Sequence, residues 1–353
     1  MPNKACSVQQ TAGILRDLKA FLYTLTFFCS QAFVYPRPRS PVTLRPLGNL
    51  SCNNTRCEST NITQLLGYGG DTLEMYELFI KRRSVRNFKD RTIPEELIEK
   101  LLNAANNAPT GGNIQPISII LVQETKNRQK LADIVGDQPW VKNAPLSIIF
   151  CLDFNRVKRW AVLNGTEFKG EKAFAHFLIA YADLMCAAQT VVLLAESYEL
   201  GSVYIGTIQS NMDDAKSLFA LPEYVLPLMV LTIGYPKSIP RRIPKLERDV
   251  IVHREQYRVD SDAEIKRAFD TKYGDFGGKA EEYLEKAYIE AIEADKQGAE
   301  GWTAWAIEEM TKLEIRNNAE FLFRLRYPAD EMVMLNKRLI ESFKNAGFDF
   351  FIE

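Results

Sequence analysis

Leu146-Ser-Ile-Ile-Phe-Cys-Leu152 is an apolar run bounded by Pro145 and Asp153. Its short length and its β-branched and aromatic residues are typical of a strand buried in a core. Similar runs occupy residues 117–123 and 228–234, and a shorter one follows Gly201 at residues 202–205. The sequence therefore predicts a sheet that contains at least these four strands.

Helical patterns lie between these strands. Thr92-Ile-Pro94-Glu-Glu96 predicts a helix start, because proline is tolerated in the first turn and carboxylates interact favourably with the positive end of the helix dipole. Residues 171–198 are apolar on most sides, which is typical of a helix enclosed by a core. We expect helices and strands to alternate through the central part of the chain.

Charge and residue usage exclude several classes of protein. The chain has 44 Lys and Arg against 45 Asp and Glu, so its net charge of -1 disfavours nucleic acid as the main ligand. It has 2 histidines, far apart in sequence, and 6 cysteines without a convincing zinc-binding spacing. We therefore expect neither nucleic acid nor a metal, and chemistry that depends on an organic cofactor.

The two flanking regions differ from the centre. Residues 1–74 contain a proline-rich stretch and an Asn/Ser/Thr run, which predict a disordered extension and linker. Their apolar segment at 20–34 is too short and too interrupted to span a membrane, so we expect no membrane span and a cytoplasmic location. A degenerate signal peptide that directs secretion is the alternative.

Residues 261–353 carry 20 Asp and Glu against 13 Lys and Arg. Apolar residues recur there at spacings of three and four over 280–296, 302–316 and 331–345, which predicts amphipathic helices. We expect a helical, acidic C-terminal extension, and a central domain at residues 75–260.

Three stretches of the central domain suit a phosphorylated, planar ligand. The first is Lys81-Arg82-Arg83-Ser84-Val85-Arg86, where guanidinium groups match paired phosphate oxygens and a hydroxyl adds a donor. A basic turn that faces water is the simpler interpretation of this stretch.

The second is Pro109-Thr110-Gly111-Gly112-Asn113-Ile114-Gln115. Its glycines permit close approach of the backbone to a ligand, and its two amides can hydrogen-bond a heterocycle, although the same residues also make ordinary turns. The third is Gly201-Ser-Val-Tyr204-Ile205-Gly206-Thr207, a strand end that can offer free backbone amides; Lys245, in the basic loop after the last strand, can neutralise a phosphate. Its simpler interpretation is a helix-to-strand loop followed by a basic loop.

Motifs for other chemistries do not occur in the sequence. It contains no Gly-x-Gly-x-x-Gly that opens a helix after a strand, no Walker loop, no His-Glu-x-x-His and no Gly-x-Ser-x-Gly. A Rossmann dehydrogenase, a P-loop nucleotidase, a zinc protease and a serine hydrolase are therefore disfavoured.

Taken in order and with their spacing, the three stretches resemble the nitroreductase family of FMN-dependent oxidoreductases over residues 75–258. The resemblance implies an α+β fold in which a mostly antiparallel sheet is wrapped by helices, and an interlocked homodimer with FMN at its interface. It also implies the cofactor-binding residues. Those that would hold the phosphate and ribityl chain are Arg82, Arg83, Ser84, Arg86 and Lys245; those that would contact the flavin from the partner subunit are Thr110, Asn113 and Gln115; and those that would lie along the isoalloxazine are Tyr204, Ile205, Gly206 and Thr207.

The resemblance further implies a ping-pong oxidoreductase in which NADH or NADPH is the donor and a nitroaromatic, quinone or flavin is the acceptor. Because the flavin carries the chemistry, no side chain is expected to be catalytic. Trp140, Trp160 and Phe168 are candidates to line the substrate entrance, or equally to belong to the core.

Two alternatives remain at this point. One is a reductive dehalogenase of the iodotyrosine deiodinase type, whose lid would need an acid, a tyrosine and a lysine after Asp153. Residues 155–172 contain acids and lysines, Glu167, Lys169, Glu171 and Lys172, but no tyrosine. The other is a non-catalytic FMN-binding module.

Overall fold

The computed structural model describes residues 72–240, 242–274 and 296–350. The predicted N-terminal extension, apart from residues 72–74, lies outside the described residues, as does nearly all of the helix expected at 280–296. The predicted linker and the segment considered as an alternative signal peptide fall in the same undescribed region.

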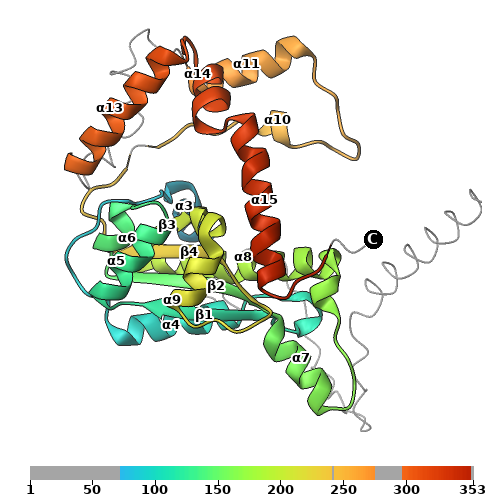
Figure 1. Cartoon of the computed structure of the whole chain (residues 1–353). Helices are drawn as coiled ribbons and strands as arrows, with labels where there is room; N and C mark the ends of the chain where they lie inside the picture. Colours follow the sequence, from blue (N-terminus) through green and yellow to red (C-terminus); the bar gives the residue numbers. More distant parts are fainter. Residues whose placement is uncertain (1–71, 241, 275–295, 351–353) are drawn as a thin grey trace, which may run out of the picture. The chain divides into compact units, whose positions relative to one another are not determined.

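A four-stranded antiparallel sheet forms the centre of the described chain (Figure 1). Its strands follow the order β1-β2-β4-β3 and comprise β1 (Ile117–Val122), β2 (Leu146–Asp153), β4 (Val225–Gly234) and β3 (Gly201–Ile205). The four predicted strands are confirmed, with ends that differ by at most three residues. The predicted α+β fold with a mostly antiparallel sheet is confirmed as well.

Both faces of this sheet are covered, so β2 and β4 are buried at every position. Alternate side chains of a strand point to opposite faces. In β2, Ile148 and Phe150 join a core that includes residues of α4 (Glu95–Asn106) and α8 (Phe174–Ser197). Ile149 and Cys151 join a second core, to which α5 (Thr125–Ile134), α6 (Pro139–Asn143) and α9 (Met212–Leu218) contribute. A strand buried on both faces reads as a continuous apolar run, as observed here.

The helix α8 is the longest apolar helix of the described residues. By length and composition alone it is apolar enough to cross a membrane, but 44% of its most apolar window is buried within the protein, and a core helix meets the same test. Its first turns leave apolar side chains uncovered: Phe174, Leu178 and Ile179 are 44%, 52% and 48% exposed. His176 in the same turns is also exposed.

Helices also dominate the C-terminal region, as predicted. They comprise α10 (Arg248–Ile251), α11 (Asp262–Tyr273), α13 (Lys296–Lys312), α14 (Asn318–Glu320), the π-helix η4 (Phe321–Arg326) and α15 (Ala329–Asn345). Ser261 begins α11 with a capping box, in which Ser261 and Glu264 each accept a backbone N–H of the other. Phe343 in the last turn of α15 and Phe348 just after it are buried in the core formed with α4 and α8. The last helix is therefore anchored in the main core.

Candidate cofactor site

The basic stretch 81–86 follows α3 (Thr72–Lys81) and lies along β3. The Val85 N–H donates to the Ser202 carbonyl at 3.0 Å, and Ser84 and Ser202 form a parallel bridge. A Cβ at Gly201 would lie 2.4 Å from a Val85 methyl, so glycine permits this close approach. The structure thus brings the basic stretch and the 201–207 stretch together, two segments that are more than a hundred residues apart in the sequence.

The arginines of this stretch have different partners. The Arg83 guanidinium donates to the carbonyls of Ile80 and Arg82, both at 2.9 Å, so it caps the C-terminal end of α3. The Arg86 guanidinium lies over the Trp140 ring at 5.6 Å. The Arg82 guanidinium has no hydrogen bond or ion pair within the described part of the chain, and its charge lies close to Tyr204 and Glu196.

Burial dominates the electrostatics on the β3 side of this stretch. It raises the pKa of Tyr204 to about 12, against the opposing charge of Arg82. It also raises the pKa of Glu196, which the charges of Arg82 and Arg83 partly offset. The Tyr204 hydroxyl donates to Gln189 of α8 at 3.1 Å. Tyr204 is therefore a neutral, anchored side chain beside a positively charged segment.

The end of β3 leaves backbone exposed at Gly206, where η3 (Gly206–Asn211) begins. A Cβ at Gly206 would meet no atom within 4 Å, whereas the neighbouring Ile205 is buried. The Thr207 hydroxyl donates to the Val135 carbonyl and accepts from Gln138, both at 2.9 Å. The Thr207 side chain is thus bound within the fold, and the open space lies beside Gly206.

The turn at residues 110–115 has a strained backbone. Gly112, Asn113 and Gln115 have φ angles of 58°, 55° and 52°, in the left-handed region. For Asn113 and Gln115 this conformation costs roughly 1–3 kcal/mol each. Strain of this kind persists where surrounding contacts hold the backbone, and it recurs at ligand-binding turns.

Two residues that the sequence analysis missed hold this turn. Asp183 of α8 accepts the Gly111 N–H at 2.9 Å, and burial raises the pKa of Asp183 although this hydrogen bond opposes the change. Arg156 of α7 (Phe154–Leu163) donates to the carbonyls of Gln115 at 2.8 Å and Ile117 at 2.6 Å. Arg156 also pairs with Asp153 at 3.2 Å. The Asp-x-x-Arg spacing at the end of the predicted strand is therefore the sequence feature that could have identified Arg156.

The loop that carries Lys245 starts beside the basic stretch. Lys89 N–H donates to the Tyr235 carbonyl at 2.8 Å, and Phe88 and Pro236 form an antiparallel bridge. Lys245 itself is exposed, further along the loop. The start of the loop therefore belongs to the same side of the molecule as the arginines.

The predicted residues consequently form two groups rather than one. The turn leads into Ile117 of β1, which is aligned with Leu226 of β4 across the sheet. Ser84 pairs with Ser202 of β3, which is in turn paired with Ile233 of β4. Seven residue steps along β4 separate Leu226 from Ile233, or roughly 23 Å at about 3.3 Å per residue. A single chain does not bring the turn to the arginines.

The three aromatic candidates for the substrate entrance also separate. Trp140 lies under Arg86, and Phe168 packs edge-on against Phe154 at 5.2 Å. Trp160 is 48% exposed on α7, and its ring lies 5.7 Å from the Arg156 guanidinium. Of the three, Trp160 offers the most accessible ring.

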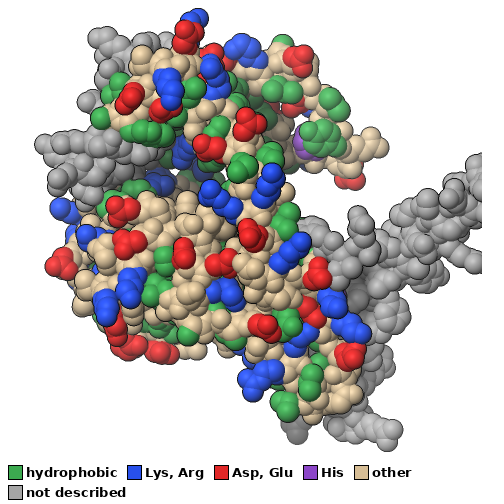
Figure 2. All heavy atoms as spheres, in the orientation of Figure 1, with side chains coloured by type: hydrophobic (Ala, Val, Ile, Leu, Met, Phe, Trp, Pro, Cys, Tyr) green, Lys and Arg blue, Asp and Glu red, His purple; other side chains and the backbone are tan. Residues whose placement is uncertain are grey.

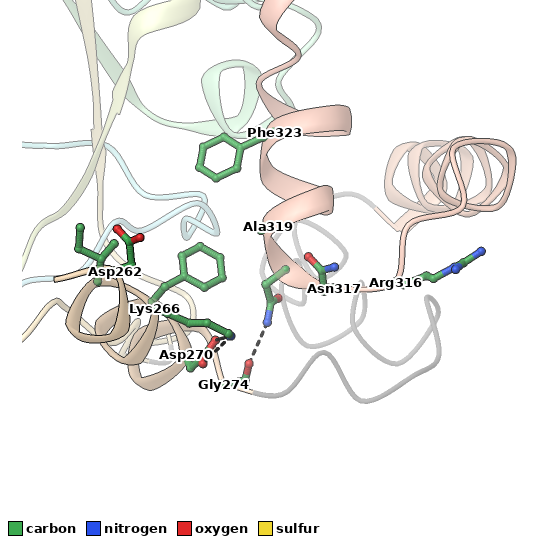
Figure 3. Close-up of a pocket in the computed structure, with 11 residues that line it drawn as sticks. Asp262, Lys266, Asp270, Gly274, Arg316, Asn317, Ala319 and Phe323 are labelled. Atoms are coloured by element: carbon green, nitrogen blue, oxygen red, sulfur yellow. Dashed lines mark hydrogen bonds and ion pairs between the residues drawn. The ribbon is translucent and has the colours of Figure 1, made fainter.

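The two cavities described next lie away from the arginine stretch 82–86. One of about 950 Å³ lies between α11 and α14, where Lys266 and Asp270 form part of the wall, and none of the predicted cofactor residues lines it (Figure 3). Another, of about 400 Å³, is lined by Asp153 and residues along the whole of α7, among them Arg156, which also donates to the Gln115 carbonyl of the turn. No group of three or more His, Cys, Asp or Glu placed to hold a metal occurs among the described residues.

Comparison with known proteins identifies the family. The nitroreductase family model matches residues 80–235. An FMN reductase [NAD(P)H] of Bacillus subtilis is 33% identical over 186 residues, which are 52% of this chain and 74% of that protein. An oxygen-insensitive NADPH nitroreductase of Salmonella typhimurium is 32% identical over 185 residues, with the same coverages of 52% and 74%.

Solved structures extend the likeness beyond residue 235. The B. megaterium NfrA2 structure has a TM-score of 0.60 and 27% identity, and the match covers 79% of this chain and 99% of that one. The Vibrio harveyi NADPH:FMN oxidoreductase complexed with NAD+ has a TM-score of 0.52 and 29% identity, with coverages of 56% and 84%. The predicted resemblance is confirmed: the chain belongs to the nitroreductase family.

Proposed function

We propose that the protein is an FMN-dependent oxidoreductase that uses NADH or NADPH to reduce small electron acceptors in a ping-pong cycle. Family membership supports this proposal, as do the names of relatives, which include an FMN reductase, an NADPH nitroreductase and, from Pseudomonas sp., a CR(VI) reductase. Nitroaromatics, quinones and flavins are the acceptors that we propose.

The residues present fit the phosphate end of FMN. Arg82, Ser84 and Arg86 belong to a segment that is hydrogen-bonded to β3, where two guanidinium groups and a hydroxyl would be available to a phosphate, and Lys245 can add charge from the loop after β4. Arg83 would contribute charge from its capping position at the end of α3. The observation that carries the proposal is this fixed arginine segment next to open space at Gly206.

The flavin ring would lie along the end of β3. Gly206 leaves room for a planar group, and the backbone of residues 204–207 would offer donors to the ring edge while Tyr204 stays neutral. FMN, when bound, supplies the hydride chemistry. The protein's part is to bind, orient and polarise, so we propose no catalytic side chain.

A second copy of the chain would complete this site. The turn with Thr110, Asn113 and Gln115 lies too far from the arginines of its own chain to share one flavin with them. The exposed apolar side chains of α8 adjoin the turn, since a Cβ at Gly111 would lie 2.7 Å from an Ile179 methyl. We propose a homodimer in which α8 is buried and each turn faces the partner's flavin.

The domain limits and the location stay proposals. We propose an FMN-binding domain at 75–260, an extension at 1–74 and a helical extension at 261–353 that is anchored by α15. We also propose a cytoplasmic location, with secretion as the alternative.

Two observations speak against the dehalogenase alternative. Glu171 is buried and paired with Lys158 at 2.5 Å, and Glu167 is paired with Lys169 at 2.7 Å. Both acids that a lid would use to hold an amino acid are thus already paired with a lysine.

Flavin spectroscopy tests the function directly. Purified full-length protein is incubated with FMN, desalted, and titrated anaerobically with NADPH or NADH. We expect a flavin band that bleaches and then recovers when a quinone is added. If the protein binds FMN but neither donor bleaches the flavin band, the protein is the non-catalytic FMN-binding module. If the protein retains no FMN, the proposal is contradicted.

A further inference from the structure

The carboxyl group of Glu196, in the last turn of α8, differs from the acidic groups that stand in water. Figure 2 shows Asp and Glu side chains interspersed with Lys and Arg over the face of the molecule in view. Glu196 is instead half-buried, and its Oε2 atom is buried without a hydrogen-bond partner among the described residues. Because a carboxylate oxygen withdrawn from water is unfavourable without a donor, this group needs a compensating charge or a proton.

Three elements meet around this carboxyl group. The helix α8 packs against both α3 and β3. The Tyr204 hydroxyl of β3 donates to Gln189 of α8 at 3.1 Å, and Glu196 lies seven residues after Gln189, on the same face of the helix. The arginine stretch 82–86 is bridged in parallel to β3, so its first residue lies toward the start of that strand, which follows the end of α8. The arginines and Glu196 therefore belong to one cluster.

Arg82 is the cation of this cluster that can act as a counter-charge. The Arg83 guanidinium caps α3, whereas Arg82 has no hydrogen bond or ion pair within the described part of the chain. Burial raises the pKa of Glu196, and the charges of Arg82 and then Arg83 oppose this change. The position of Glu196 at the C-terminal end of α8 also disfavours negative charge, because the helix dipole is negative there. The arginines thus favour the anionic form of a group whose other surroundings favour the neutral one.

The neighbouring titratable groups are neutral, paired or in water. Tyr204 stays neutral because burial raises its pKa to about 12. The other charged or titratable groups that α3, α4 and the end of α8 contribute are Glu77 paired with Lys81 at 3.3 Å, Glu96 paired with Lys100 at 2.8 Å, Tyr198 with its ring 5.8 Å from Lys100, and the exposed Glu199. The carboxyl group at the end of α8 is therefore the one that a new charge at the arginines would affect most.

We propose that Glu196 is the counter-charge of Arg82 in the FMN-free protein and that the FMN phosphate replaces it, so that binding of FMN is coupled to uptake of a proton by Glu196. The inference rests on the proposed function, because it concerns the regulation of that same site by pH. A phosphate on Arg82 cancels the charge that favours the Glu196 carboxylate and adds repulsion between two anions. A proton from water converts the carboxylate to the neutral acid and removes this repulsion.

Calorimetric titrations with FMN test the coupling. Full-length wild type, Glu196→Gln and a control, Glu199→Gln, which removes an exposed carboxylate nearby, are compared at about pH 8 and about pH 5. We expect Glu196→Gln to bind FMN roughly tenfold more tightly than wild type at the higher pH and equally at the lower one, because glutamine resembles the protonated acid. The control should match wild type at both. All proteins meet the same FMN, so titration of its phosphate cancels in this comparison.

Proton counting and riboflavin separate this coupling from a merely structural role. In buffers of different ionisation enthalpy, wild type should take up more protons on binding FMN than Glu196→Gln does, and Glu196→Asp, which keeps a carboxylate, should recover the uptake. Riboflavin has the same ring without the phosphate, so its affinity should not respond to Glu196→Gln.

Three results would overturn the proposal: equal or weaker binding of FMN by Glu196→Gln at the higher pH, an equal gain for riboflavin, or equal proton uptake by wild type and Glu196→Gln. A wild-type protein that binds FMN at neither pH would refute the proposed function itself, and this inference with it.

Discussion

The arginine stretch 82–86 and the turn 110–115 are the two halves of the candidate site, and they are built in opposite ways. The arginine stretch has an ordinary extended backbone and offers charged side chains, one of which also caps α3. The turn is uncharged and places Asn113 and Gln115 in a strained backbone that Asp183 and Arg156 hold. The comparison indicates that the arginine stretch would bind the cofactor through charge, whereas the turn would define the shape of the site through its rigid backbone.

The largest effect should follow from removing charge. Replacing Arg82 and Arg86 together by Ala removes two charge-assisted contacts of roughly 1.5–3 kcal/mol each, which predicts a rise in the Kd for FMN of about 100-fold or more. Equilibrium dialysis against FMN measures it, with Lys126→Ala as control. Unchanged affinity would show that these two arginines do not hold FMN.

Disturbing the support of the turn should act on the fold. Arg156→Ala leaves the buried Asp153 carboxylate without its cation and frees the Gln115 carbonyl, so we expect a loss of about 2–3 kcal/mol in the free energy of unfolding. Urea unfolding checks this, and Arg156→Lys should recover part of the loss. If stability stayed within about 0.5 kcal/mol of wild type, Arg156 would not hold the turn.

Two glycines beside the arginine stretch form a matched pair. Gly201→Ala places a methyl against Val85 and should destabilise the protein by about 1–3 kcal/mol. In Gly206→Ala the added methyl meets open space, so the free energy of unfolding should stay within about 0.5 kcal/mol of wild type. The affinity for FMN should fall, because the methyl occupies the space proposed for the flavin. Unfolding and flavin-binding measurements on both variants check this, and equal destabilisation by the two would contradict the geometry.

The smallest effect concerns pH. Burial raises the pKa of Asp183, so the folded protein holds this proton more tightly than the unfolded chain does. The contribution of Asp183 to stability therefore falls as pH rises from about 4, the ordinary value for an aspartate, through the raised folded value. Asp183→Asn should flatten that decline in urea unfolding between acid and neutral pH, and an unchanged slope would rule out this titration.

Much of the fold was predictable because it depends on local pattern. Buried strands such as β2 read as apolar runs, and the Pro94 start of α4 follows from dihedral restriction. The pairing of Gly111 with Asp183 was not predictable, because its partners are 72 residues apart and a lone Asp in an apolar helix has no distinctive spacing. Nor could the sequence show that the turn and the arginines lie at opposite ends of the sheet, since that depends on strand register.

Subunit complementation tests the shared site most directly. Arg82→Ala/Arg86→Ala and Asn113→Gly/Gln115→Gly, in which glycine keeps the turn's backbone accessible, are co-expressed with different tags. Each variant alone should retain little FMN. The doubly purified heterodimer should bind one FMN and turn over, because one of its two sites has intact halves from both chains. A heterodimer as empty as its parents, or a wild-type protein that binds FMN as a monomer, would contradict the account.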